Sequence, residues 1–196
     1  VGAGFTGLWT AYYLAQADPT LRIAVIDKDV AGFGASGRNG GWCSALFPAS
    51  SDKVSRLPGS DRAGAQALHA AMCDTVDEVG RVVAVEGIDA DYAKGGTIVL
   101  ARTQTELARA RAEVAGARAW DRGEDDLRLL DAAEASSALG ATQVLGATYT
   151  PHCAAIHPAK TVRGLAEAVA RRGVTIYEQT PVIAIEPARV RTEHGT

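Results

Sequence analysis

The chain has 196 residues, of which 47% are hydrophobic, and a formal net charge of -3 at pH 7. This length is enough for one large or two small domains with a buried core. Lys and Arg are scattered along the chain, so we expect no nucleic-acid-binding surface, and we expect neither a membrane span nor a signal peptide. The three cysteines lie far apart and outside C-x-x-C pairs, which indicates neither a disulfide framework nor a zinc site and favours a cytoplasmic protein.

Residues 1–7 read V-G-A-G-F-T-G and contain the pattern G-x-G-x-x-G. In a dinucleotide-binding turn, Gly2 allows the strand to reverse, Gly4 lets the backbone approach a pyrophosphate, and Gly7 lets the next helix pack closely. The phosphates then lie at the helix N-terminus, where unpaired N–H groups and the helix dipole favour an anion. The motif alone is weak, because glycine-rich turns also occur in ordinary loops.

The residues that follow supply the context for this turn. Leu8, Ala11, Tyr12 and Ala15 lie at helical spacing, and a helix built on them would end at Asp18. Residues 23–26 form an apolar run that predicts a buried parallel strand. Asp27 stands at the end of that strand, twenty residues after Gly7, where its carboxylate could accept hydrogen bonds from a ribose 2'-hydroxyl.

A second glycine-rich stretch, residues 34–42, reads G-A-S-G-R-N-G-G-W. A flexible linker has no use for Arg and Asn among its glycines. A loop laid against a phosphate and a planar ring uses glycine for close approach, Arg38 for charge, and Ser36 and Asn39 for hydrogen bonds. The stretch therefore indicates a loop that binds a nucleotide cofactor.

Together, the G-x-G-x-x-G turn, the acid ending the second strand and the G-A-S-G-R-N-G-G loop resemble the FAD-dependent oxidoreductases of the D-amino-acid oxidase superfamily. This group contains glycine oxidase and sarcosine oxidase, and residues 34–42 are most similar to its γ-glutamylputrescine oxidase branch. The resemblance implies an α/β fold, in which a Rossmann-like FAD-binding domain carries an inserted α+β substrate domain, incomplete in this fragment. The commoner family acid at the Asp27 position is Glu, so the ribose contact would be adjusted by one methylene.

The resemblance also implies which residues contact FAD. Gly2, Gly4 and Gly7 would line the pyrophosphate, Asp27 and Lys28 would meet the ribose, and Ser36, Arg38 and Asn39 would hold the phosphates and ribitol. Gly40 and Gly41 would run beside the isoalloxazine, and the backbone of Val182 would pair with the adenine edge. The full predicted set is Gly2, Gly4, Phe5, Thr6, Gly7, Asp27, Lys28, Ala35, Ser36, Arg38, Asn39, Gly40, Gly41 and Val182.

Family members with covalent flavin attach it through a His or Cys. No His lies near the loop, and Cys43 has no matching role, so the FAD is predicted to be non-covalent. The reaction implied is oxidation of an amine or amino acid by hydride transfer from a C–H next to nitrogen to flavin N5, with dioxygen or another acceptor reoxidising the flavin. Two alternatives stay open: an FAD dehydrogenase or hydroxylase, and a non-catalytic nucleotide-binding module. No catalytic residue is identified.

The middle of the chain predicts further helices and strands. Apolar residues recur at three- and four-residue steps over 61–86, which indicates one long amphipathic helix capped at Gly87. We expect a strand near 97–100, a helix over 103–119, a short helix started by a capping box at Asp131 and Glu134, and a strand over 146–150. His69 within the long helix is interpreted as an ordinary helix residue, because no second ligand type was identified at useful spacing.

The segment His152–Pro158 holds two histidines and one cysteine but no carboxylate, so a crossing segment is favoured over a metal site, and no metal is predicted. A helix after Pro158 and a strand over 174–177 then predict a second helix–strand unit. The domains expected are FAD-binding over 1–89 and 156–196, and substrate-binding over 90–155. Because only one residue precedes Gly2 and the last strand lacks a closing element, we expect a chain truncated at both ends.

Overall fold

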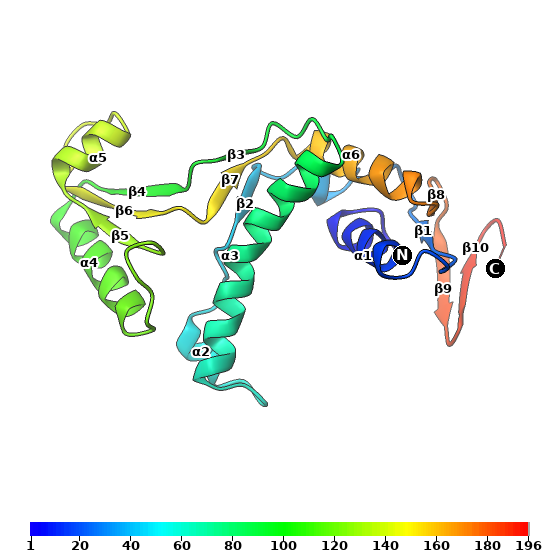
Figure 1. The fold of residues 1–196 in the computed structure, drawn as a ribbon, viewed down its shortest axis with the longest axis horizontal. Helices are drawn as coiled ribbons and strands as arrows, with labels where there is room; N and C mark the ends of the chain where they lie inside the picture. Colours follow the sequence, from blue (N-terminus) through cyan, green and yellow to red (C-terminus); the bar gives the residue numbers. More distant parts are fainter. Residues whose placement is uncertain (196) are drawn as a thin grey trace. The chain divides into compact units, whose positions relative to one another are not determined.

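The computed structural model describes residues 1–195, which form two compact units (Figure 1). The first unit comprises Val1–Trp42, Gly80–Tyr92 and the chain from Ile156 onward. The second comprises Cys43–Val79 and Ala93–Ala155. Residues 43–79, expected in the FAD-binding part, cluster in the structure with the second unit. One contact that contributes is the sheet formed by β2 (Trp42–Ser44), β7 (Cys153–Ala155) and β3 (Ala93–Lys94).

The first unit is built on a parallel pair of strands, β1 (Ala24–Ile26) and β8 (Thr175–Tyr177). Two helices accompany them, α1 (Phe5–Ala17) and α6 (Pro158–Arg171), and these pack against each other (Figure 1). The order strand, helix and parallel strand is the one predicted for a doubly wound fold. A hairpin of β9 (Val182–Glu186) and β10 (Arg189–Thr192) follows β8.

The core of the first unit explains the apolar spacing seen in the sequence. The residues at helical spacing in α1 all turn inward and are buried against the apolar stripe of α6. Removing this surface from water supplies the main driving force, at about 25 cal/mol per Å² of apolar area. The buried members are Ala3, Leu8, Ala11, Tyr12, Ala15, Val25, Ala31, Val82, Val162, Leu165, Ala166, Ala168, Val169 and Val174.

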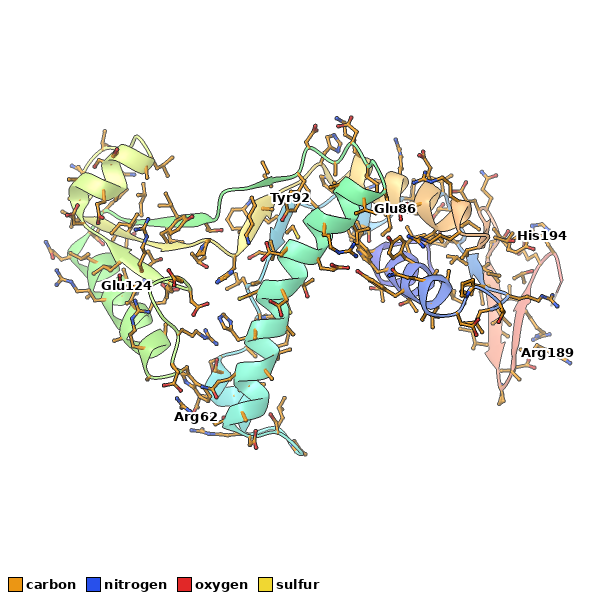
Figure 2. The ribbon with its side chains drawn as sticks, in the orientation of Figure 1. Arg62, Glu86, Tyr92, Glu124, Arg189 and His194 are labelled. Carbon is orange, nitrogen blue, oxygen red and sulfur yellow. The ribbon has the colours of Figure 1, made fainter. Side chains whose placement is uncertain are left out.

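A polar network fastens the end of α3 (Arg62–Val85) to this core. The hydroxyl of the buried Tyr12 donates to Glu86 Oε1 at 2.8 Å, and Arg172 Nη2 donates to the Tyr12 oxygen at 2.9 Å. Arg171 and Arg172 both form ion pairs with Glu86, which Figure 2 labels beyond the end of α3. Burial opposes ionisation of Glu86, but the hydrogen bonds from Tyr12, Arg172 and Arg171 outweigh it, so the pKa of Glu86 lies below its ordinary value.

The second unit contains an antiparallel sheet with the order β4-β6-β5, formed by β4 (Thr97–Ala101), β6 (Gly146–Thr150) and β5 (Arg128–Leu130). Helices α4 (Gln104–Arg118) and α5 (Ala132–Ala138) pack on this sheet, and the short helix α2 (Ser51–Ser55) precedes α3. Both α4 and α5 begin with a capping box, at Thr103 with Glu106 and at Asp131 with Glu134. In each box the side chains satisfy helix and N-cap N–H groups reciprocally.

The predicted helices and strands are confirmed, with boundaries that differ by at most three residues. The helix expected over 61–86 is α3, the helix expected over 103–119 is α4, and the strand expected over 174–177 is β8. The predicted capping box of Asp131 and Glu134 is present. Among the helices of residues 1–195, none combines the length and apolar character that crossing a membrane requires.

Candidate functional site

The G-x-G-x-x-G turn is hydrogen-bonded to the last residue of β1. The N–H of Gly2 donates to the carbonyl of Ile26 at 2.7 Å, and Gly2 has a φ of +99°, a conformation that favours glycine. A Cβ on Gly7 would lie 1.9 Å from the carbonyl oxygen of Gly2, and one on Gly4 would lie 2.8 Å from Ser36 Oγ. Gly2 and Gly7 therefore each meet a geometric requirement of the turn, whereas a side chain on Gly4 would displace the hydroxyl of Ser36.

The N-terminus of α1 offers unpaired donors. Gly4 is its N-cap and supplies no side-chain cap, and the first turn carries no acidic residue. The N–H of Phe5 donates to Ser36 Oγ at 2.9 Å. Within residues 1–195, the N–H groups of Thr6 and Gly7 have no acceptor. Free N–H groups at the positive end of a helix dipole form a site for a phosphate or another anion.

Asp27 joins the turn to the strand end. Its Oδ2 accepts a hydrogen bond from the N–H of Ala3 at 2.6 Å, and its Oδ1 accepts one from the N–H of Asp29 at 2.9 Å. A carboxylate has about four acceptor sites, so these two bonds leave capacity for further donors such as hydroxyl groups. Lys28 beside it is exposed. The structure thus brings Asp27 to the glycine turn, and its contact with a ribose stays a prediction.

The second glycine-rich loop contains a single 3₁₀ turn, η1 (Ala35–Gly37), that packs on α6. Asn39 folds this loop: its Nδ2 donates to the carbonyls of Ala35 and Ser36, and its Oδ1 accepts from the N–H of Gly41. A role for Asn39 in shaping the loop was missed in the sequence, where its amide was assigned only to the cofactor. Its direct contact with phosphate or ribitol stays a prediction.

Arg38 offers an exposed cation, and Gly40 and Gly41 differ in the space around their backbone. The guanidinium of Arg38 is exposed and lies 4.3 Å from the centre of the Phe33 ring. It has no carboxylate partner in the part of the chain that the structure describes. Gly41 has a φ of +75°, and a Cβ there would lie 2.4 Å from the carbonyl oxygen of Ile156, whereas a Cβ on Gly40 would meet nothing within 4 Å.

The segment before Val182 lies next to Asp27. The N–H of Thr180 donates to the carbonyl of Asp27 at 2.8 Å, and the N–H of Gln179 donates to that of Asp29 at 3.1 Å. Val182 itself begins β9 and pairs with Thr192. The structure therefore brings the predicted adenine-binding segment to the same strand end as the predicted ribose-binding acid, and the adenine contact itself stays a prediction.

These groups fit FAD by their chemistry. The free N–H groups at α1 suit a pyrophosphate, Arg38 supplies an unpaired cation, and Asp27 retains acceptor capacity for hydroxyl groups. All of them belong to the first compact unit.

The second unit holds a cavity of 480 Å³ with a mostly apolar lining, to which Phe47, Val54, Leu68 and Met72 contribute. One part of its lining is polar and includes His69, Asp126 and His152. The grouping of these three residues was not predicted from the sequence, although His69 and Cys73 lie four residues apart, on one face of a helix. This spacing of His69 and Cys73 was the feature of the sequence that could have indicated the cluster.

Comparison with known proteins agrees with this geometry. The profile of the family described as FAD dependent oxidoreductase (DAO) matches residues 1–196. The chain is 32% identical over its whole length to γ-glutamylputrescine oxidoreductase of Escherichia coli, of which it covers 45%. It is 30% identical, over 93% of its length, to a probable oxidoreductase, OrdL, of Haemophilus influenzae, of which it covers 41%.

Two solved structures show the same fold. Glycine oxidase of Geobacillus kaustophilus superimposes with a TM-score of 0.74 at 26% identity, and the match covers all of this chain and 50% of that one. L-amino acid deaminase of Proteus myxofaciens gives a TM-score of 0.76 at 20% identity, over 99% of this chain and 41% of that one. The chain thus spans about half the length of its relatives. With the glycine turn, the strand-end acid and the Ser36–Arg38 loop in one unit, the chain belongs to the family of FAD-dependent oxidoreductases known as DAO.

Proposed function

We propose that the whole protein is an FAD-dependent oxidase of an amine or amino acid. In this reaction the C–H next to nitrogen gives up a hydride, the imine formed is hydrolysed, and dioxygen is reduced to hydrogen peroxide. The observation that carries the proposal is the N-terminus of α1, where free N–H groups lie beside the loop that holds Ser36 and Arg38. FAD, when bound, supplies the acceptor for the two electrons.

The residues of the first unit would hold the cofactor in a defined pose. We assign the pyrophosphate to the N–H groups of Thr6 and Gly7, with Arg38 supplying a charge-assisted hydrogen bond. Asp27 would accept from the ribose, with Lys28 beside it, and the backbone of Val182 would meet the adenine. Gly40 has open space where a side chain would stand, which supports a planar ring lying against that backbone.

The substrate class rests on the named relatives. One is a γ-glutamylputrescine oxidoreductase and another a glycine oxidase, and both names specify compounds that carry an amine. We assign residues 90–155 to the substrate-binding part, as the sequence analysis did. Because the chain spans about half of its relatives, the residues that would hold a substrate carboxylate are assigned to the rest of the whole protein.

We further propose that the FAD is not covalently attached. The described part of the loop, residues 34–42, contains no His, and burial raises the pKa of the adjacent Cys43 thiol, which disfavours the reactive thiolate. Acid precipitation of the full-length protein should leave all of the flavin in the supernatant. Flavin that stays in the pellet would refute this part of the proposal.

The experiment that tests the reaction is an anaerobic titration of the full-length protein with a panel of amines and amino acids. The proposal predicts that one substrate bleaches the flavin absorption, and that admission of air restores it with formation of hydrogen peroxide. Bleaching without recovery in air would favour the dehydrogenase. A folded, flavin-loaded protein that no member of the panel reduces would contradict the proposed substrate class.

A further inference from the structure

Four potential metal ligands meet in the second unit, outside the predicted cofactor site. His69 and Cys73 lie on adjacent turns of α3, Asp126 lies in the loop after α4, and His152 lies just before β7. The Nε2 of His69 lies 3.7 Å from Cys73 Sγ and 3.9 Å from Asp126 Oδ1. One ligand atom each from His69, Cys73 and Asp126 falls within 4.8 Å of the others. Segments far apart in the sequence therefore place nitrogen, sulfur and oxygen together.

The two distances from His69 are close to those of a tetrahedral metal site, and the ligand atoms of Cys73 and Asp126 lie within 4.8 Å of each other. With metal–ligand lengths of about 2.1 Å for nitrogen and oxygen and about 2.3 Å for sulfur, tetrahedral ligand atoms stand roughly 3.4 to 3.6 Å apart. The distances from His69 to Cys73 and to Asp126 exceed this by only a few tenths of an ångström. Imidazole and thiolate together with a carboxylate suit Zn²⁺ in preference to Mg²⁺ or Ca²⁺, which take oxygen ligands.

His152 completes the cluster as a hydrogen-bonding partner. Its Nε2 lies 3.0 Å from Asp126 Oδ1, so an Nε2–H donates to that carboxylate. Its Nδ1 is buried and has no hydrogen-bond partner within residues 1–195. Residues that ligate metals are commonly held in place by such outer hydrogen bonds, whose loss typically weakens metal binding about 10- to 100-fold.

The surrounding charges are compatible with a divalent cation. A Cys73 thiolate and the Asp126 carboxylate would balance the two charges of Zn²⁺. The nearby cation, Arg122, donates to Ser51 Oγ. Burial raises the pKa of the Cys73 thiol, so the thiolate would be stabilised by the bound cation itself, which deprotonates a coordinating thiol.

We propose that His69, Cys73 and Asp126 bind Zn²⁺, with His152 orienting Asp126 and a water molecule as fourth ligand. On binding, the Cys73 S–H bond breaks, an S–Zn bond forms and the proton is released to solvent. The ion would link α3 to the loop after α4 and would fix the polar part of the cavity lining. This site is separate from the residues assigned to FAD and does not depend on the proposed reaction.

Cobalt substitution tests the site in the full-length protein after removal of bound metal with a chelator. Tetrahedral Co²⁺ gives d–d bands in the red, where oxidised flavin does not absorb. We expect these bands in the wild type and in Cys43→Ser, a matched control in the same unit. We expect Cys73→Ser to lose or strongly shift them, and His152→Ala to weaken Co²⁺ binding by about 10- to 100-fold.

A second measurement distinguishes loss of metal binding from failure of a variant to fold. Zn²⁺ should raise the midpoint of thermal unfolding of the wild type and of Cys43→Ser, but not that of Cys73→Ser, with secondary structure checked by circular dichroism. Absence of tetrahedral Co²⁺ bands in the folded wild type would overturn the proposal. So would equal Co²⁺ spectra for the wild type and Cys73→Ser.

Discussion

The backbone N–H of Phe5 donates a 2.9 Å hydrogen bond to the side-chain oxygen of Ser36, and so joins the first turn of α1 to the second glycine-rich loop. The two residues are 31 positions apart in the chain. This bond brings the motif that offers free N–H groups next to the loop that carries Arg38. Cofactor binding should therefore depend on both segments together.

Replacing Ser36 by Ala removes this acceptor and leaves the N–H of Phe5 without a partner. We expect a loss of about 1 kcal/mol, or roughly a fivefold weakening of FAD binding, because the loop loses its anchor on α1. Fluorescence titration of the apoprotein with FAD measures the effect. The control is Ser55→Ala in α2, where the hydroxyl donates to the carbonyl of Asp52 in the same helix. Equal FAD affinities for the two variants would contradict the role given to Ser36.

Gly7→Ala should prevent the turn from forming, because the added Cβ would lie 1.9 Å from the carbonyl oxygen of Gly2. Overpacking of this kind costs about 3 kcal/mol. The matched control is Gly116→Ala in α4, where a Cβ meets nothing within 4 Å and the change should stabilise the helix by about 0.5 to 1 kcal/mol. The midpoints of thermal unfolding of both variants measure these changes in stability. A Gly7→Ala protein as stable as the wild type would show that the turn tolerates a side chain.

Arg38→Ala removes an exposed guanidinium that has no ion-pair partner in the described chain. If it donates to phosphate, its loss should cost about 1.5 to 3 kcal/mol and weaken FAD binding roughly ten- to hundredfold, with little change in stability. Arg56→Ala serves as the control, because the side chain of Arg56 is 75% exposed and forms an ion pair with Asp52 four residues earlier. Unchanged flavin content in Arg38→Ala would exclude the phosphate contact.

Glu86 should contribute to acid sensitivity. Although burial opposes its ionisation, hydrogen bonds from Tyr12, Arg172 and Arg171 keep the pKa of Glu86 below its ordinary value of 4.5. A carboxyl group whose pKa is lower in the folded state stabilises the fold above the unfolded pKa, and this stability is lost as the pH falls through the folded pKa.

Glu86→Gln should therefore destabilise the protein by about 2 kcal/mol at neutral pH and flatten the dependence of stability on pH below about 4.5. Urea unfolding at neutral and acid pH gives both quantities. Glu167→Gln, on the exposed face of α6, should change neither. A Glu86→Gln protein whose free energy of unfolding falls with pH as steeply in acid as that of the wild type would contradict this role of Glu86.

Local patterns allowed most helices and strands to be predicted from the sequence. Burial of Leu8, Ala11, Tyr12 and Ala15 on one face of α1 follows from their helical spacing, and the box of Asp131 and Glu134 begins α5 as its residue types require. Asp27 could be placed at a strand end because β1 is apolar throughout its length. In each case the physical cause lies within a few residues of the chain.

Features that depend on distant residues could not be predicted in this way. The amide of Asn39 binds the carbonyls of its own loop, a choice that depends on how the loop lies on α6. Asp126 and His152 reach His69 only because the fold brings three segments together. Likewise, residues 43–79 cluster with the second unit, and the pairing of β2 with β7 that contributes to this cannot be recognised from periodicity.

If the N-terminus of α1 and the Ser36–Arg38 loop bind FAD, the purified full-length protein contains flavin. We expect an oxidised flavin absorption spectrum, stoichiometric release of FAD on acid denaturation, and strong loss of that flavin in Arg38→Ala but not in Arg56→Ala. A folded wild-type protein that contains no flavin and binds none from solution would contradict this expectation.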